Sequence, residues 1–347
     1  MPKYNHQKLI DLATQLLTKS GLPEDRAQVT AKTLVEADLM GHFTHGLALL
    51  NPYLSSIENG GMKLDGDPET LMDTGSTANW NGQYLPGCWL VDQAIELGLK
   101  RVKHHPVFTL TIQQCHHIGA LAAYPERATK NGLVMILSCS DPSHRSVAPF
   151  GGREAKYSPN PMAFGFPTEG DPIIMDISMS ATAMGLINQK KESGEKLPQP
   201  WLQDAEGKPT ADPNDFFAEP PGAIMPLGGK ESGYKGFALG MMVELLTSGL
   251  AGHGRSEKPE KWGCSVFIQI IDPKAFGGIE NFKKQAQFLT NEFSSTTPID
   301  PNNPVRIPGH RALKMKNDQL KSGVELSQSI LKSLAFWAQK LDIPFDN

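Results

Sequence analysis

An α/β fold is predicted by three features of the 347-residue sequence. Between residues 71 and 299, short apolar runs that resemble buried strands occur together with longer segments of helical periodicity. Amphipathic helical segments flank this region at both ends of the chain. The composition, 39% hydrophobic and 20% charged, is ordinary for a globular protein with one large domain or two intertwined lobes.

The N-terminal part is expected to be helical. A first helix is predicted by leucines that recur on one face: Leu9, Leu12, Leu16 and Leu17. A second helix begins near Pro23, because proline and the two acids that follow it favour a first turn. A third helix carries Tyr53 and Ile57 and ends at the sequence NGG. The sequence GHFTHG, residues 41–46, is therefore predicted to join two helices.

The central region is predicted to alternate between the two element types. Strands are expected at residues 69–74, 77–82, 106–115, 133–140, 172–180 and 264–272. Helices are expected at residues 86–105, 121–132, 234–250 and 277–293. Residues 187–232 are rich in Pro, Gly, Lys and Glu and are predicted to be irregular, which is usual for a functional or interface segment.

The last helix should carry Leu326, Ile330, Leu334 and Trp337. We expect residues 300–347 to form a helical part that packs with the helical part at residues 1–70. Residues 71–299 would then form a central α/β domain.

Charge and cysteine usage narrow the class of protein. The net charge of −4 gives no basic field for nucleic acid or an anionic membrane, so neither partner is expected. The N-terminus lacks the apolar core of a signal peptide, and no stretch approaches the roughly 18 apolar residues of a membrane span. The four cysteines are scattered without a CxxC pair, so we expect no disulfide framework or thiolate zinc site and a cytoplasmic location.

Two histidine pairs are the strongest candidates for chemistry. His42 and His45 have the i, i+3 spacing of metal ligands, but no acidic or thiol partner at a familiar spacing accompanies them, and no metal site is predicted. The alternative is a histidine that caps or bridges the helix junction. His116 and His117 end a predicted strand, a favoured position for ligand-binding residues in open α/β sheets.

Phosphate-binding signals are weaker. Gly151 and Gly152 could present backbone N–H groups to a phosphate, although an ordinary turn explains them as well. Asp176 lies in an apolar strand and needs a partner there, either a ribose or the backbone. The helix that begins near Tyr234 and Lys235 has the glycines and lysines of an anion site. With neither a GxGxxG motif nor a P-loop, the residues indicate an α/β enzyme with a histidine-centred polar site.

Taken in order, seven motifs resemble those of the type-2 malate/L-lactate dehydrogenase family: EADLMGHFTHG, HHIG, VAPFGG, SPNPMAFGFP, MDISMSATAMG, GYKGFALG and RIPGH. The resemblance covers nearly the whole chain. It implies a non-Rossmann NAD(P)-binding fold with a mixed sheet in the central domain, N- and C-terminal helical segments on the substrate side, and a homodimer. It also explains why GxGxxG is absent.

The resemblance implies hydride transfer between NAD or NADP, with NAD favoured, and a 2-hydroxy or 2-amino carboxylate, which is converted to its 2-oxo or imine form. His45 would donate or accept the proton, since histidine titrates near working pH, and His117 and Thr44 would hold the small-molecule substrate. The cofactor stretches of the family fall on Pro172, Ile173, Ile174, Met175, Asp176, Ile177, Ser178, Tyr234, Lys235, Gly309, His310 and Arg311.

Two departures from the family pattern concern the substrate. Phe43 replaces an aspartate, and Leu49 replaces the arginine that typically engages the substrate carboxylate. Either another cation such as Arg145 or Arg153 takes its place, or the substrate is not the usual 2-oxo acid. Two other functions remain open. One is a metal-dependent hydrolase or lyase that uses His42, His45, His116 and His117. The other is a cofactor-binding family member with altered catalysis.

Overall fold

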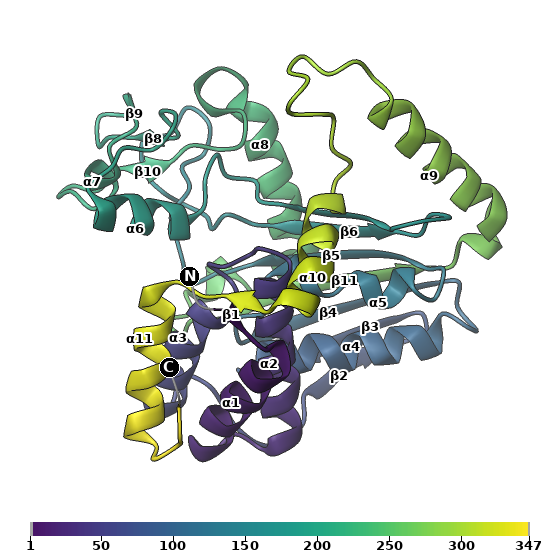
Figure 1. Cartoon of the computed structure of the whole chain (residues 1–347), viewed down its shortest axis with the longest axis horizontal. Helices are drawn as coiled ribbons and strands as arrows, with labels where there is room; N and C mark the ends of the chain where they lie inside the picture. Colours follow the sequence, from purple (N-terminus) through teal and green to yellow (C-terminus); the bar gives the residue numbers. More distant parts are fainter. Residues whose placement is uncertain (1–2, 346–347) are drawn as a thin grey trace.

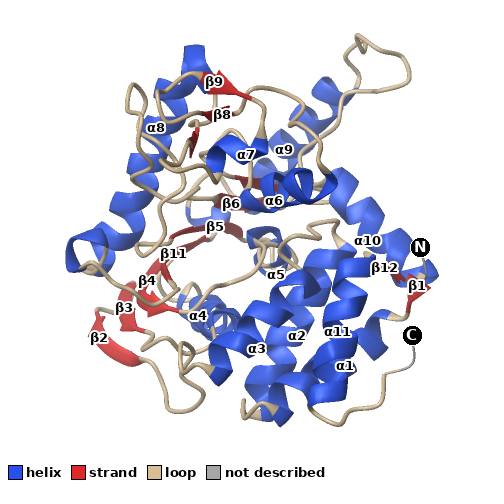
Figure 2. Ribbon diagram, turned by 90° about the vertical axis from the view of Figure 1, so that its left-hand side faces the viewer, coloured by secondary structure: helices blue, strands red, loops and turns tan. Residues whose placement is uncertain are grey.

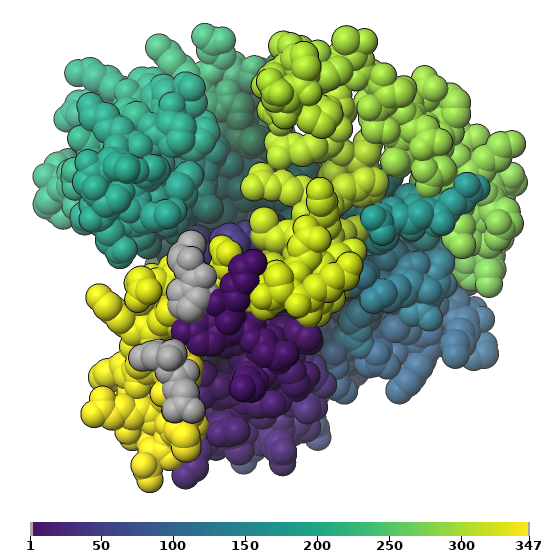
Figure 3. All heavy atoms as spheres, in the orientation of Figure 1, coloured from purple at the N-terminus to yellow at the C-terminus, as the bar shows by residue number. Residues whose placement is uncertain are grey.

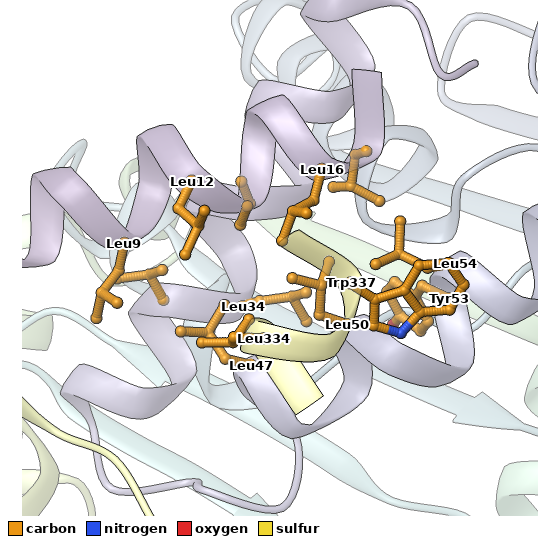
Figure 4. Packing of buried hydrophobic residues seen from close by; sticks show 14 of the residues in the cluster. Leu9, Leu12, Leu16, Leu34, Leu47, Leu50, Tyr53, Leu54, Leu334 and Trp337 are labelled. Atoms are coloured by element: carbon orange, nitrogen blue, oxygen red, sulfur yellow. The ribbon is translucent and has the colours of Figure 1, made fainter. Parts of the chain in front are cut away.

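The computed structural model describes residues 3–345 and places helices from both ends of the chain in one lobe (Figure 1). Three N-terminal helices, α1 (His6–Lys19), α2 (Glu24–Leu39) and α3 (Leu50–Glu58), pack with the last helix, α11 (Gln328–Lys340). Figure 4 shows Leu334 and Trp337 of α11 among the leucines of this cluster. The short strands β1 (Lys3–Tyr4) and β12 (Val324–Glu325) pair antiparallel and join the two ends. We name this part the helical lobe.

A seven-stranded mixed sheet forms the centre of the molecule, in the order β2-β3-β4-β11-β5-β6-β7. Its strands are β2 (Glu69–Asp73), β3 (Thr77–Asn81), β4 (Val107–Cys115), β5 (Val134–Ser140), β6 (Met162–Phe166), β7 (Ile173–Ile177) and β11 (Cys264–Ile271). The pair β3–β4 is parallel and is connected by α4 (Gly87–Arg101), whereas the other neighbouring pairs are antiparallel. The predicted α/β class with a mixed sheet is confirmed.

Helices cover both faces of the sheet (Figure 2). On one face, α4 packs on Phe108 and Ile270, and the side chains of Leu137 and Cys139 join the same cluster. On the opposite face, Val243 of α8 (Gly229–Glu244) packs near Ile136 of β5. Ile136 is next to Leu137 in the strand and therefore points to the other face. Alternation of side chains along a strand explains why one strand supplies both clusters.

A small lobe forms where an irregular stretch was predicted. Residues 187–232 belong to a segment that contains α6 (Met184–Ser193), α7 (Pro213–Phe216) and a three-stranded sheet of β8 (Leu202–Gln203), β9 (Pro209–Thr210) and β10 (Ala223–Ile224). It has its own hydrophobic cluster, which includes Ile187 and Ile224. The segment is therefore not irregular throughout, and its short elements were missed because turns rich in Pro and Gly separate elements of only a few residues. Figure 3 shows this lobe in teal as a bulge beside the helical lobe.

Three other elements differ from expectation. The helix predicted at residues 121–132 is reduced to α5 (Glu126–Thr129) after a single 3₁₀ turn, because Pro125 interrupts it. Strand β6 was not predicted, and neither was α10 (His310–Ser322), which packs against α2. The remaining helix, α9 (Ile279–Ser294), lies as expected. No helix in the described part of the chain is long and apolar enough to span a membrane.

Candidate active site

A cavity of about 970 Å³ opens where the helical lobe, the sheet and the small lobe meet. Its walls come from segments far apart in the sequence: the loop after α2, the ends of β4, β5 and β7, the start of α6 and the loop before β11. The lining residues include His42, Thr44, His45, His117, Asp141, His144, Asp176, Ser178, Met184, Glu260 and Trp262.

The loop that carries His42 and His45 is shaped by a buried carboxyl group beneath it. Asp38 is fully buried near the end of α2 and accepts a hydrogen bond of 2.8 Å from the N–H of Leu47. Gly46 lies against the same carboxyl group, where any Cβ atom would overlap it. Burial raises the pKa of Asp38 to about 7, opposed by the bond from Leu47. The predicted helix junction is confirmed, since α2 ends at Leu39 and α3 begins at Leu50.

His45 lies in this junction and faces the second histidine pair. Its Nδ1 atom is 2.9 Å from the hydroxyl of Thr44, and its ring stacks on that of His117 with the centroids 5.9 Å apart. Burial lowers the pKa of His45, while the negative charge of Asp176 acts in the opposite direction. Because the pKa is lowered, the imidazole is neutral at pH 7 and can serve as a base.

His117 is held in one orientation and one tautomer. Its Nδ1 accepts the backbone N–H of Gly119 at 3.2 Å and lies 2.9 Å from the hydroxyl of Tyr53. A backbone N–H can only donate, so Nδ1 carries no proton and the proton must lie on Nε2. Burial, together with His45 and His116, keeps the pKa of His117 well below its ordinary value. His117 is therefore a neutral hydrogen-bond donor beside His45.

His116 points away from the cavity, in contrast to its neighbour. Its Nε2 lies 2.9 Å from the hydroxyl of Ser56, and its ring packs edge-on against Tyr53 and Trp262. Burial lowers the pKa of His116 to about 3. It is a structural histidine, so the two pairs seen in the sequence contribute His42, His45 and His117 to the cavity.

Asp176 lies in the cavity wall close to the histidines. One carboxylate oxygen accepts the N–H of Ala122 at 2.9 Å, so the backbone is one partner of this carboxylate. Burial raises the pKa of Asp176, and His42 and His45 act against this shift. The sequence suggested a cofactor contact for Asp176 but not its place near His42 and His45.

The stretches predicted to bind cofactor are only partly brought together. Asp176 and Ser178 line the cavity, and the turn at Gly309 packs so closely on Ile174 of β7 that a Cβ atom would approach its backbone nitrogen to 2.8 Å. Tyr234 and Lys235 lie on the exposed side of α8, outside the cavity lining. Their assignment to the cofactor stays a prediction.

The turn at residues 149–152 is closed by a 2.8 Å bond from the N–H of Gly152 to the carbonyl oxygen of Pro149. Gly151 has a φ of 83° and, like Gly152, lies outside the cavity lining. Both observations agree with the ordinary-turn alternative.

No lysine or arginine is found among the described residues that line the cavity. Leu49, which stands in the place of the family arginine, packs against the hydrophobic cluster of the helical lobe. Arg145 is exposed, and Arg153 lies against Gly207 of the small lobe. Neither arginine replaces the missing cation within this chain.

The residues present are suited to a nicotinamide group. The cavity has the volume of a ligand site, and Leu121 and Pro161 provide apolar wall. Beside the lining residue Ala183, the buried hydroxyl of Thr182 has no hydrogen-bond partner among the described residues. At the start of α6, Gly185 lies against Thr44, where a Cβ atom would come within 2.5 Å of the Thr44 methyl carbon. An amide-bearing ring could pair with such polar groups.

A metal centre is not suggested by the geometry. Among the described residues, no group of three or more His, Cys, Asp or Glu side chains is arranged to hold a metal ion. All four cysteines are buried and free, and Cys139 and Cys264 lie in the cavity wall.

Three contributors to the cavity region were missed from the sequence. Tyr53 ends the GHFTHGLALLNPY motif, and this position was a usable signal. Asp141 lies in a segment that differs from the family pattern, which was a second signal. Trp262, whose ring lies 5.0 Å from that of His117, had no signal in the sequence.

The chain matches the family model described as malate/L-lactate dehydrogenase over residues 4–335. It is 30% identical over 339 residues to the malate/(S)-sulfolactate dehydrogenase of Methanothermus fervidus, with 96% of each chain covered. It is also 30% identical to the (2R)-3-sulfolactate dehydrogenase (NADP(+)) of Chromohalobacter salexigens, covering 94% of this chain and 95% of that one.

A solved structure with the same fold is the delta1-piperideine-2-carboxylate reductase from Pseudomonas syringae pvar. tomato. It has a TM-score of 0.85 and 27% identity, and the match covers 97% of this chain and 100% of that one.

Proposed function

The chain belongs to the malate/L-lactate dehydrogenase family, and from this premise we propose how its cavity carries out the reaction of a hydroxy-acid dehydrogenase. The enzyme is an oxidoreductase that uses a nicotinamide cofactor and acts on the CH–OH group of a hydroxy acid. The observation that carries the proposal is the convergence of His45, His117 and Asp176 at one cavity.

The residues divide the work of the reaction. In the direction of oxidation, neutral His45 accepts the proton of the substrate hydroxyl, and the carboxylate of Asp176 stabilises the imidazolium that forms. His117 donates from Nε2 to the substrate oxygen, and Thr44 orients the ring of His45 through Nδ1. Bound in the cavity, the cofactor supplies the acceptor or donor for hydride. In reduction, protonated His45 returns the proton.

We favour NAD over NADP as the cofactor. Recognition of a 2′-phosphate usually needs a cation, and no lysine or arginine lies among the described lining residues. Ser178, Asp176 and the orphan hydroxyl of Thr182 are the polar groups proposed to hold the nicotinamide end. Steady-state kcat/KM with NADH and with NADPH decides this preference.

We also propose a homodimer in the cytoplasm. One side of α8 and its continuation exposes a row of large apolar side chains: Tyr234, Met241, Leu245 and Leu250, which are between 51% and 62% exposed. An apolar stripe of this size on a helix is typical of a protein interface. A second copy of this chain is the expected occupant, in agreement with the family resemblance. The four free thiols favour a reducing compartment.

The alternatives left open by the sequence are less well supported. The hydrolase hypothesis conflicts with the family, whose named members are dehydrogenases, and with the lack of a metal-binding group among the described residues. The hypothesis of a cofactor-binding protein without catalysis gives no role to the arrangement of Thr44, His45 and His117.

A screen of NADH and NADPH oxidation tests the proposed function. The panel should contain 2-oxo acids and diketo sugar acids, together with cyclic imino acids, because a structural relative is named as an imine reductase. We expect turnover of at least one 2-oxo acid, unaffected by a chelator. Saturable cofactor binding without any turnover would contradict the proposal.

A further inference from the structure

The cavity carries carboxylates in its wall without a fixed cation to balance them. Asp141, Asp176 and Glu260 line it, whereas the lining groups that can become positive are histidines. Asp176 lies at the catalytic end, near His42 and His45. Asp141 lies in the loop after β5, at residues that depart from the family pattern.

One oxygen of Asp141 is occupied within its own loop. Oδ1 accepts the N–H and hydroxyl of Ser143, at 2.9 and 2.7 Å, and the N–H of His144 at 3.1 Å. Oδ2 accepts no hydrogen bond from the described residues, although the side chain lines the cavity. Burial raises the pKa of Asp141, because the hydrogen bonds do not fully compensate the loss of water. Oδ2 faces the cavity and is free to pair with a hydrogen-bond donor on a bound ligand.

The position of Asp141 is fixed from outside the cavity by Arg255. The guanidinium donates to the carbonyl oxygens of Asp141 and His144 at 2.8 and 2.7 Å and to the hydroxyl of Ser158 at 3.1 Å. Glu244 holds the guanidinium itself in an ion pair at 2.7 Å. The charge of Arg255 is thus shared with Glu244, and its other donors bind backbone carbonyl oxygens and the hydroxyl of Ser158. The loop cannot move Asp141 out of the wall without breaking these bonds.

We propose that Asp141 is a specificity-determining residue, which selects hydroxy or oxo acids that carry a cationic, hydrogen-bond-donating group beyond the reacting carbon. Glu260, at the exposed rim, supports the same preference. The cavity correspondingly disfavours a second anionic group of the kind found in malate and sulfolactate. The inference rests on the proposed function, because it names the substrate class of the same site.

The physical reason is a difference in desolvation. A distal ammonium or guanidinium would pair with Oδ2 of Asp141, which restores what burial removed. A distal carboxylate or sulfonate would lose its water and find no lysine or arginine among the described residues that line the cavity. Leu49, which stands in the place of the family arginine, packs in the helical lobe and offers no positive charge to the cavity. The carboxylates in the wall therefore repel an anionic distal group as well as attract a cationic one.

Three linear 2-oxo acids provide the test: 2-oxo-5-guanidinopentanoate, 2-oxohexanoate and 2-oxoadipate, with cationic, neutral and anionic ends. We expect kcat/KM to fall in this order, by about tenfold or more between the first and the last. The full-length protein is assayed with saturating NADH and, separately, NADPH.

The variant Asp141→Asn keeps an oxygen that can accept from Ser143 and His144 but removes the charge. It should reduce the ratio of kcat/KM for the guanidino acid over 2-oxohexanoate by about tenfold, with the neutral acid changed only a few-fold. Asp318→Asn, on the exposed side of α10 and outside the cavity, is the matched control and should leave the ratio unchanged. Should Asp141→Asn not fold, Glu260→Lys at the rim is the second variant and should raise the relative use of 2-oxoadipate.

The proposal is overturned if the wild type uses 2-oxoadipate as well as or better than 2-oxohexanoate, or if the charge-removing variant leaves the ratio unchanged. Turnover of pyruvate alone would also overturn it, because the cavity would then not admit a distal group. Failure of every oxo and imino acid with both cofactors would instead contradict the proposed function, and the role of Asp141 with it.

Discussion

His45 and its neighbours show how burial sets the chemistry of single residues. Three imidazoles are close together, and their pKa values are lowered for the same reason, the loss of water around the ring. They differ in what surrounds them: only His45 has both the hydroxyl of Thr44 on Nδ1 and the counteracting charge of Asp176. This environment is the reason why we propose His45, and neither of the other two, as the group that exchanges a proton with the substrate.

Replacement of His45 by Ala should lower kcat by about 10²- to 10⁴-fold, because proton transfer loses its donor and acceptor. The measurement is steady-state turnover with the substrate found in the screen, compared with His104→Ala, an exposed histidine far from the cavity lining. Activity within a few-fold of the wild type would show that another group moves the proton.

The pH dependence should differ between the two reaction directions. Because the pKa of His45 is lowered, the neutral base persists below pH 6.5, so kcat/KM for oxidation should stay constant from pH 8 to that point and fall only in more acidic solution. Reduction needs protonated His45 and should therefore decline as pH rises through the same lowered value. If kcat/KM for oxidation already fell to half of its maximum above pH 7 as the solution was acidified, this assignment would be contradicted.

His116 should make the protein sensitive to acid. Its folded-state pKa of about 3 lies below the unfolded value of 6.5, so the unfolded chain binds more protons between these limits. Stability from this group is complete above pH 6.5 and is lost as pH falls, by up to about 1.4 kcal/mol per unit.

The variant His116→Gln, which can still pair with Ser56, should lose less stability on acidification. Its Tm deficit relative to the wild type should shrink between pH 7.5 and pH 4.5. His104→Gln serves as the exposed control, and a deficit that does not change with pH would refute this role for His116.

At the scale of elements, the cavity depends on a close approach between a helix start and a loop. The first turn of α6 lies against Thr44 because Gly185 has no side chain. This contact joins the small lobe to the loop of the helical lobe that carries His45. The approach therefore couples the position of the start of α6, which lines the cavity, to that of the His45 ring.

Gly185→Ala should displace Thr44, since the new Cβ would lie 2.5 Å from its methyl carbon. A shift of about 1 Å at a reacting group can cost on the order of 100-fold in rate, so we expect at least a tenfold loss in kcat/KM. Gly277→Ala, where no atom lies within 4 Å, is the matched control. Equal activities of the two variants would show that the contact is not needed.

Long elements were predictable from periodicity, whereas short ones were not. The strands β4, β5 and β11 are rich in apolar and β-branched residues over seven to nine positions, and α9 and α11 repeat their apolar residues at helical spacing. The strands β8, β9 and β10 have two residues each, too few for any period to be visible. Their pairing with one another, and their shared core under α6, depends on contacts that lie far apart in the sequence.

At the scale of the whole molecule, the catalytic cavity exists because three parts of the chain meet. The helical lobe supplies His45, the end of β4 supplies His117, and β7 at the sheet edge supplies Asp176. A change in how the parts pack would therefore alter the distances between reacting groups. The proposed dimer belongs to this scale, because α8 lies on the outer side of the sheet.

The double variant Met241→Asp/Leu245→Asp should convert the dimer to a monomer, because two buried charges at an apolar interface cost several kcal/mol. Light scattering after size-exclusion chromatography measures the mass. Phe288→Asp on α9, where the native side chain is 56% exposed, is the control and should remain dimeric. If the control dissociated and the double variant did not, the interface would involve α9 and not α8. A monomeric wild type would contradict the proposed dimer.

The sequence by itself determined the α/β class, the long elements and, through the order of its motifs, the family and the choice of His45 and His117. Only the tertiary structure decided which way neighbouring side chains face. His116 and His117 are adjacent in the sequence, yet one bonds to Ser56 and the other lines the cavity. Leu49 packs on the core of the helical lobe, while Asp141 is brought to the cavity by the loop after β5 and Asp176 by strand β7. Such directions follow from packing between segments distant in sequence, which no local pattern contains.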